Sequence, residues 1–280
     1  MNQKKSTGTV VAAVFRWIFL TFITVISVGP LCWIMMSSFK TNQEILSSAF
    51  SLPSTFNFKG YIDALNLSPI FQYFLNSVII AFASTALSVM VVAMAAYIIA
   101  RTKFHGSKFI ILMLSSSLLI PTAALLMPIY IIMAQTGLYD TRLGLVVVYA
   151  ALGLPTSFFI LRSHFQSIPH EIEEAAYLDG CSFLHTFISI VLPMAKSGLA
   201  TAGILQFLTS WNEFMFALIL TKSNKVRTLP LAMTYFTSQF SFNYTAMFAA
   251  LVLAILPSIL IYVLMQEQIT GSLVSGSVKG

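Results

Sequence analysis

Charged residues are scarce in this sequence. Only 9% of its 280 residues are Asp, Glu, Lys or Arg, whereas 58% are hydrophobic and the mean hydropathy is +0.87. A water-soluble domain of this length needs many more polar side chains to cover its surface. The composition therefore predicts an integral membrane protein in a lipid bilayer, and we expect no nucleic acid among its partners.

Disulfide, metal and catalytic patterns are missing too. The two cysteines, Cys32 and Cys181, lie far apart, so no disulfide framework is implied. Residues 170–174, His-Glu-Ile-Glu-Glu, begin like a zinc-protease helix but have Glu where the second His must stand. The chain has no G-x-x-x-x-G-K-[ST] phosphate-binding loop and no nucleophile–base pair. We therefore expect no metal, no bound cofactor and no enzymatic activity in this chain.

Long apolar runs take the place of these motifs. About 20 mainly apolar residues cross the ~30 Å hydrocarbon layer of a bilayer. Six segments qualify: residues 17–36, 74–100, 109–133, 143–161, 197–220 and 246–266. The sequence thus predicts an all-α protein with six transmembrane helices. Residues 1–16 would form a tail, 17–36 the first transmembrane helix, 37–73 an extracytoplasmic segment, 74–266 a five-helix core and 267–280 a second tail.

The distribution of Lys and Arg predicts the orientation. With the N-terminus inside, nine of the 15 basic residues are cytoplasmic, and short loops and the first helix carry the most weight. Six of the nine decide the orientation: Lys4, Lys5 and Arg16 before the first span, and Arg101, Lys103 and Lys108 after the second. Six spans then place both termini in the cytoplasm. An external basic cluster at 222–227 opposes the rule; it either contacts an acidic partner or is a solvated turn.

The loop at 162–193 is acidic and lies between the fourth and fifth spans. Its acids are Glu171, Glu173, Glu174 and Asp179. Apolar residues at 168, 172, 175 and 176 have helical spacing, which predicts a short helix with one apolar and one carboxylate-rich side. Pro169 favours a helix start, and Gly180 favours a stop because glycine readily adopts the left-handed conformation. With a second helix at 182–191, we predict a cytoplasmic helix-turn-helix.

This loop resembles the EAA loop of the membrane subunits of bacterial ABC importers. The shared pattern is E-A-A, three residues, G, nine residues and I-x-L-P. In this sequence it places Glu174, Ala175, Ala176, Asp179, Gly180, Ile190, Leu192 and Pro193 in the loop. The resemblance implies that the loop is a coupling helix that seats in a cleft of a cytoplasmic ATPase subunit. It also implies that ATP and Mg are bound by separate ATPase subunits.

The resemblance extends over the chain to the sugar-transporting branch of that family. It rests on the runs at 36–40 (Met-Ser-Ser-Phe-Lys), 74–77 (Phe-Leu-Asn-Ser), 211–214 (Trp-Asn-Glu-Phe) and 276–280 (Gly-Ser-Val-Lys-Gly). It implies a permease in a bacterial cytoplasmic membrane that imports a sugar or oligosaccharide and forms half of the translocation path. The implied partners are a second permease subunit, two ATPase subunits and an extracytoplasmic sugar-binding protein.

Three residues near the external end of the fifth span are candidates for a gate or substrate path. They are Trp211, Asn212 and Glu213. An acid in a span is costly unless it faces the bundle interior or water, so Glu213 is either functional or extends to the interface. Most sugar contacts in the maltose-type relatives come from the partner permease, so direct sugar binding here is the weaker expectation.

Several alternatives remain open at this point. Pro30, Pro121, Pro128, Pro155 and Pro257 interrupt spans and also suit a self-sufficient channel or secondary transporter. The aromatic residues of segment 37–73 fit either an interfacial belt or a docking face. The small pairs Ser84/Ser88 and Gly198/Ala202 fit either packing within the bundle or a dimer interface.

Overall fold

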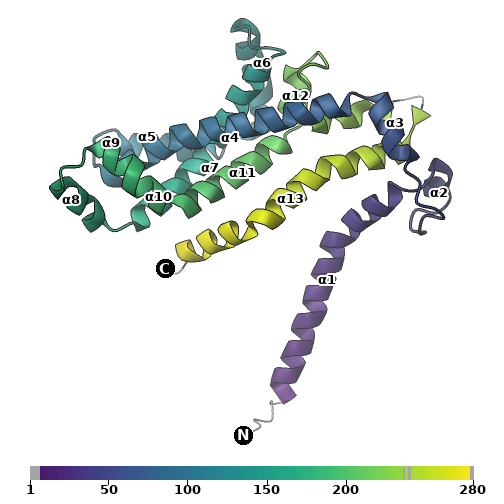
Figure 1. Cartoon of the computed structure of the whole chain (residues 1–280), viewed down its shortest axis with the longest axis horizontal. Helices are drawn as coiled ribbons and strands as arrows, with labels where there is room; N and C mark the ends of the chain where they lie inside the picture. Colours follow the sequence, from purple (N-terminus) through teal and green to yellow (C-terminus); the bar gives the residue numbers. More distant parts are fainter. Residues whose placement is uncertain (1–6, 236, 239–240, 278–280) are drawn as a thin grey trace. The chain divides into compact units, whose positions relative to one another are not determined.

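The computed structural model describes residues 7–235, 237–238 and 241–277, with side chains for 13–234, 243–264 and 266. Regular structure in these residues is helical (Figure 1), apart from two short antiparallel strands, β1 Thr237–Ser238 and β2 Ser241–Phe242. The chain forms two compact units. The first is Met1–Ser68 with Met233–Leu253, and the second is Pro69–Ala232 with Ala254–Gly280.

The first unit contains α1 (Thr7–Ser37), α2 (Asn42–Ser47), α3 (Lys59–Leu67) and the start of α13 (Tyr244–Ser277). Trp33 of α1 packs edge-to-face on Phe248 of α13, with ring centroids 5.1 Å apart. Gly60 of α3 lies so close to Thr245 that a Cβ would come within 2.8 Å of its carbonyl oxygen. These contacts hold segment 37–68 against the start of α13.

Hydrogen bonds give the segment after α1 a fixed shape. Lys40 is only 1% exposed, and its Nζ donates to the carbonyl oxygen of Ala49 over 3.0 Å. The Glu44 carboxylate accepts from the Thr41 N–H (2.7 Å) and from the N–H and hydroxyl of Ser54. The bond from the Ser54 hydroxyl, followed by those from the N–H groups, lowers the pKa of Glu44 to about 2.

Three helices form the core of the second unit: α4 (Ile70–Arg101), α7 (Arg142–Ser167) and α11 (Lys196–Trp211). The start of α7 lies beside the start of α4, because Arg142 Nε donates to Asn76 Oδ1 (2.9 Å). Their ends also meet, with the rings of Phe165 and Tyr97 5.6 Å apart. The helices α4 and α7 are therefore parallel. Helix α11 runs antiparallel to both, since Ser210 near its end is bonded to Ser84.

Small residues let these helices approach closely. A Cβ on Gly153 would overlap the amide of Gln206, and one on Gly198 would lie 2.5 Å from Cγ of His164. Ser84, Ser88 and Ala202 are also fully buried within the chain. The small pairs noted in the sequence therefore serve packing within this bundle.

Two predicted spans are broken. Between α4 and α7, α5 (Ser107–Ser117) is followed by η1 (Thr122–Leu125) and α6 (Leu126–Gln135), with a bend of 100°. Pro121 lies in the break in an extended conformation, and its ring nitrogen has no hydrogen to donate to the preceding turn. The predicted fifth span, 197–220, is likewise divided: α11 ends at Trp211 and α12 spans Met215–Leu220.

Within the part of the chain that the structure describes, four helical segments are long and apolar enough to cross a membrane: Ala13–Ser37, Ile70–Arg101, Arg142–Ser167 and Tyr244–Leu264. Two bent pairs, Ser107–Ser117 with Thr122–Gln135 and Phe183–Met194 with Lys196–Trp211, raise the number to six if each is one span. Helices extend beyond the predicted spans. Residues 7–16 and 267–277, predicted as tails, are helical, and α7 continues to residue 167. Lys4, Lys5 and residues 278–280 lie outside the described residues.

Candidate functional site

The acidic loop is a helix-turn-helix whose turn depends on glycine. Helix α8 (His170–Leu178) follows Pro169, which precedes the helix in an extended conformation. Gly180 has φ = 84°, the left-handed conformation expected of a glycine that ends a helix. The N–H of Cys181 donates to the carbonyl of Ala176 (2.9 Å), and the N–H of Gly180 donates to that of Tyr177 (3.0 Å). This pair of bonds is the Schellman motif, which satisfies carbonyls at the helix end.

The second half of the loop contains a π-helical turn. Helix α9 (Phe183–Thr186) leads into η2 (Phe187–Val191) and α10 (Leu192–Met194). The Leu192 N–H donates to the carbonyl of Phe187, five residues back. Pro193 follows and cannot donate to the carbonyl four residues before it, so the I-x-L-P run disrupts the α-helical ladder at this point. Most of the predicted helix at 182–191 is thus helical, with a wider π-helical turn in its second half.

Helix α8 has an exposed and a buried face, divided differently from the prediction. Glu171, Glu174, Ala175 and Leu178 are exposed, and Leu178 retains 89% of its accessible surface. Their spacing of three and four residues puts them on one face. Ala175 therefore lies beside Glu174 rather than on a separate apolar side. Glu173, expected on the carboxylate-rich side, is buried.

Glu173 is buried because it is paired with the end of α4. Its Oε1 lies 2.5 Å from Arg101 Nε, with side chains 6% and 4% exposed, and its Oε2 accepts from the Tyr97 hydroxyl (2.9 Å). Arg101 also donates to the carbonyl of Ile168 (2.9 Å) and lies 3.3 Å from His170 Nε2. A buried charge needs such partners. Sequence reasoning missed this pair; the one available signal was a basic residue directly after the second predicted span.

Aromatic side chains fill the space beneath the loop. The Tyr97 ring stacks on Phe187 (centroids 4.8 Å apart, planes at 25°) and lies 5.3 Å from Phe183. Phe165 of α7 packs edge-on against both Tyr97 and Phe187. Ile190 and Leu192 are half-buried, and Pro193 is exposed. Figure 1 shows α8 and α9 at the C-terminal end of α4, where these contacts gather.

The three gate candidates separate in the structure. Trp211 is buried and donates from Nε1 to the carbonyl of Ala254 (3.1 Å), whereas Asn212 is exposed and bonds back to its own helix. Glu213 lies in the break between α11 and α12. Its carboxylate accepts from the N–H groups of Phe216 (2.7 Å) and Ala217 (3.0 Å) and from the Tyr149 hydroxyl (2.7 Å). Glu213 therefore fixes the helix break to α7.

The basic cluster at 222–227 is held by residues near the start of α4. Asn76 donates to the carbonyls of Lys225 (3.0 Å) and Arg227 (2.8 Å), and Ser77 accepts from the Leu229 N–H (2.8 Å). Asp140 accepts from the N–H groups of residues 222 and 223. These bonds explain the Phe-Leu-Asn-Ser run. They use the backbone of the cluster and leave the side chains of Lys222 and Lys225 exposed.

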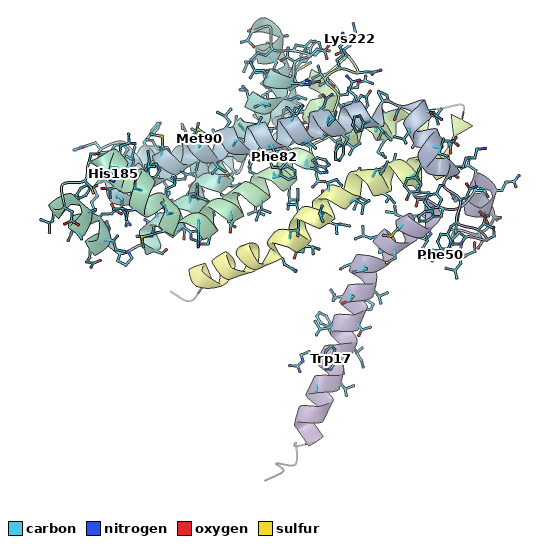
Figure 2. The ribbon with its side chains drawn as sticks, in the orientation of Figure 1. Trp17, Phe50, Phe82, Met90, His185 and Lys222 are labelled. Carbon is cyan, nitrogen blue, oxygen red and sulfur yellow. The ribbon has the colours of Figure 1, made fainter. Side chains whose placement is uncertain are left out.

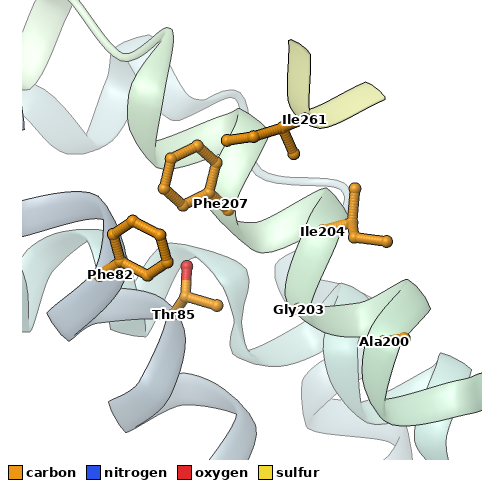
Figure 3. A pocket seen from close by; sticks show the side chains of 7 residues that line it. All are labelled: Phe82, Thr85, Ala200, Gly203, Ile204, Phe207 and Ile261. Atoms are coloured by element: carbon orange, nitrogen blue, oxygen red, sulfur yellow. The ribbon is translucent and has the colours of Figure 1, made fainter. Parts of the chain in front are cut away.

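A shallow groove lies between α4, α11 and α13 (Figure 3), with a volume of about 560 Å³. Its lining side chains are Phe82, Thr85, Ala200, Ile204, Phe207 and Ile261, with Gly203. Only one of them, Thr85, is polar. Sites that orient a small polar ligand have several convergent polar groups, which this groove lacks. Among the described residues, no group of three or more His, Cys, Asp or Glu side chains is placed to hold a metal ion.

A helical membrane protein with an exposed acidic helix-turn-helix is what these observations define. The chain belongs to the family described as "Binding-protein-dependent transport system inner membrane component", whose model matches residues 93–272. It is a multi-pass membrane protein and a permease subunit of an ABC importer. The resemblance found in the sequence is thereby confirmed.

Similar proteins include a probable ABC transporter permease of Bacillus subtilis, 37% identical over 264 residues (94% of this chain, 88% of that protein). A diacetylchitobiose uptake system permease of Streptomyces coelicolor is 37% identical over 258 residues (91% and 85%). In the crystal structure of a bacterial ABC transporter involved in alginate import, one chain is similar in fold. Its TM-score is 0.84 at 20% identity, covering 95% of this chain and 99% of that one.

Proposed function

We propose that this chain is a permease of a carbohydrate importer, and that α8 is the element through which it contacts an ATPase subunit. The observation that carries the proposal is the exposed face of α8: Glu171, Glu174, Ala175 and Leu178 lie together, and none of the described residues covers them. A small acidic and apolar knob fits a cleft with basic walls, where Glu174 pairs with a cation and Leu178 is removed from water.

Six membrane crossings with both termini in the cytoplasm account best for the arrangement. Helices α4 and α7 are parallel, so the chain from 102 to 141 must return across the bilayer through the bent pair α5–α6. Helix α11 is antiparallel to α4, which supports a membrane crossing between the loop at 162–193, here called the coupling loop, and the loop at 222–229. The Lys and Arg distribution supports a cytoplasmic position for the α8 end.

A sugar or oligosaccharide is the proposed cargo. Support comes from the diacetylchitobiose uptake permease, which is similar over most of both chains. The apolar groove offers a single hydroxyl, from Thr85, and so favours the second permease subunit as the source of most sugar contacts. In this proposal, the chain supplies half of the path, and Glu213 holds its external end in shape. A self-sufficient channel or secondary transporter does not fit membership in a family of importer components.

The remaining partners follow from the family. The description "binding-protein-dependent" supports an extracytoplasmic binding protein, and ATP hydrolysis is assigned to two separate ATPase subunits. The exposed Lys222 and Lys225 side chains supply a positive surface at the proposed external end, which suits acidic groups on a binding protein. No catalytic step is assigned to the permease itself.

Co-purification tests the role of α8. The chain is expressed with the permease and ATPase subunits encoded beside it, and the ATPase recovered with the tagged chain is measured. We expect Glu174→Lys combined with Leu178→Arg to reduce recovery at least about tenfold, since it reverses charge and polarity on one face. Lys222→Glu, a charge reversal at the opposite end of the second unit, serves as control. Full recovery with the double variant would refute the assignment.

A further inference from the structure

The coupling loop joins α7 to α11 in the sequence, yet its charged contacts are with α4. Arg101 reaches Glu173, Ile168 and His170, and all three belong to the loop. The Tyr97 hydroxyl bonds to Glu173, while its ring stacks on Phe187. Because the loop is attached to a helix that is distant in sequence, its movement need not pass through its own chain neighbours.

We propose that Tyr97 and Arg101, here called the α4 anchor, are positioning residues that fix the coupling loop to α4 and transmit its movement along that helix. The inference rests on the proposed function in one respect, namely that an ATPase subunit moves the loop.

The spacing of the anchor explains how it holds both halves of the loop. Residues four apart on a helix lie on the same face, so Tyr97 and Arg101 occupy one turn of α4. Arg101 holds α8, whereas the Tyr97 ring contacts Phe183 of α9 and Phe187 of the π-helical turn. Both sides of the Gly180 turn are therefore fixed to the same turn of α4.

Burial makes this attachment persistent. If α8 moved away from α4, a nearly fully buried arginine and a nearly fully buried glutamate would each lose their main partner. An uncompensated buried charge is strongly unfavourable, so α8 and the end of α4 should move together. Arg101 pairs with Glu173 through Nε and donates from Nη2 to the carbonyl of Ile168, and the single nitrogen of a lysine cannot reproduce both contacts in the same geometry.

Helix α4 is suited to carry this movement across the membrane. It is helical from Ile70 to Arg101 with neither proline nor glycine, whereas α7 contains Pro155 and the α11–α12 segment is broken. At its other end, Asn76 and Ser77 hold the loop at 222–229. The distance from Ser77 to Tyr97 along the helix is about 30 Å, at 1.5 Å per residue. One uninterrupted helix thus connects two loops at opposite ends of the second unit.

The native Cys181 provides a first test. It follows Gly180 directly and is half-buried. In a Cys32→Ser background, the full chain in membranes is treated with N-ethylmaleimide, and the rate of Cys181 modification is measured. We expect Arg101→Ala and Glu173→Ala to raise the rate about tenfold by releasing α8, and Arg101→Lys to give an intermediate rate. Tyr97→Phe, which keeps the ring, should have the smallest effect.

Glu171→Ala is the matched control, because it removes an exposed acid from the same helix. Its labelling rate should equal that of the parent. Parent-like rates in both Arg101→Ala and Glu173→Ala would show that the anchor does not fix α8.

A second test measures transmission itself. Cysteine is placed at position 223, a half-buried site in the loop held by α4, with Cys32 and Cys181 replaced. Trapping the complex with Mg-ATP and orthovanadate should change the labelling rate of this cysteine about fivefold. Arg101→Lys should reduce that response while vanadate still inhibits the ATPase. An undiminished response, or none in the parent despite inhibition, would overturn transmission through α4. Absence of vanadate-sensitive ATPase from the parent complex would instead count against the proposed function.

Discussion

The two ends of the second unit are built on the same helix but by different chemistry. At the C-terminal end of α4, a buried ion pair between Arg101 and Glu173 holds the coupling loop. At the N-terminal end, neutral groups of Asn76 and Ser77 hold the loop at 222–229 through its backbone. The first arrangement depends on the identity of two side chains. The second accepts many side chains in the loop that it holds.

The charges exposed on α8 and on the loop at 222–229 are opposite as well. Glu171 and Glu174 are exposed on α8, and Lys222 and Lys225 are exposed at the other end. Figure 2 labels Lys222 and His185, a residue of α9, at these separate ends. Helix α8 and the loop at 222–229 thus expose charges of opposite sign, while the side chains that support them are buried. This difference predicts that substitutions at one end should leave the other end intact.

The largest effect is expected from breaking the ion pair. Glu173→Ala leaves Arg101 buried without its carboxylate and should lower the free energy of unfolding by about 3–5 kcal/mol. Asn76→Ala leaves two carbonyls and Arg142 without an amide partner and should cost only about 1–3 kcal/mol. Urea unfolding of the detergent-solubilised chain measures both. A larger cost for Asn76→Ala would reverse the comparison.

Two glycines allow the same strain to be placed at either end. Gly180 (φ = 84°) and Gly137 (φ = 73°) are left-handed, and a Cβ at either would meet no atom within 4 Å. Valine at each should cost about 1–2 kcal/mol through the backbone alone. We expect only Gly180→Val to reduce recovery of the ATPase subunit. Equal losses in the two variants would mean that stability, rather than the geometry of the loop, determines assembly.

Glu213 should affect transport without affecting assembly. Glu213→Gln retains the shape but removes the charge that accepts from Tyr149 and from the start of α12, so the helix break should loosen. Uptake by reconstituted complexes should fall, by about threefold to tenfold if one charge-assisted bond weakens by roughly 1 kcal/mol. Tyr149→Phe removes one of the same bonds and should have a smaller effect. Unchanged uptake in both variants would leave Glu213 a structural residue only.

The smallest effect is expected from Asp140 and appears only in acid. Burial alone raises the pKa of Asp140, but bonds from Ser223 and Lys222 and the charge of Arg227 outweigh it, so the pKa lies below its usual 3.8. A lowered folded-state pKa gives stability that is present above 3.8 and lost as the pH falls through the folded value. Asp140→Asn should therefore lose less stability than the parent between pH 4 and pH 2. Identical acid profiles would contradict the pKa shift.

The sequence predicted what depends on neighbours along the chain. Each of the six apolar runs is helical or a pair of helices, and Gly180 ends α8 as its conformational freedom requires. The break near Pro121 was not located, because a proline inside an apolar run is compatible with either a kink or a full break. The break near Asn212 was not located because the predicted span 197–220 contains no proline to indicate one. The extent of α13 was underestimated because polar residues after 266 do not stop a helix.

Contacts between distant residues were the part that the sequence could not provide. Arg101 and Glu173 are 72 positions apart, and no local pattern distinguishes Glu173 from its exposed neighbour Glu174. The role of Asn76 depends equally on a loop some 150 positions later. The coupling role of α8, its side of the membrane and the gate role of Glu213 remain predictions.

Crosslinking from the exposed tip of α8 tests the central claim most directly. In a chain with Cys32 and Cys181 replaced, Leu178→Cys is placed on the exposed face, and Lys222→Cys at the opposite end of the unit is the control. Assembled complexes are treated with a short bifunctional maleimide, and the products are identified by mass spectrometry. The account predicts that Leu178→Cys links to an ATPase subunit and that Lys222→Cys does not. A link from Lys222→Cys to the ATPase, with none from Leu178→Cys, would contradict it.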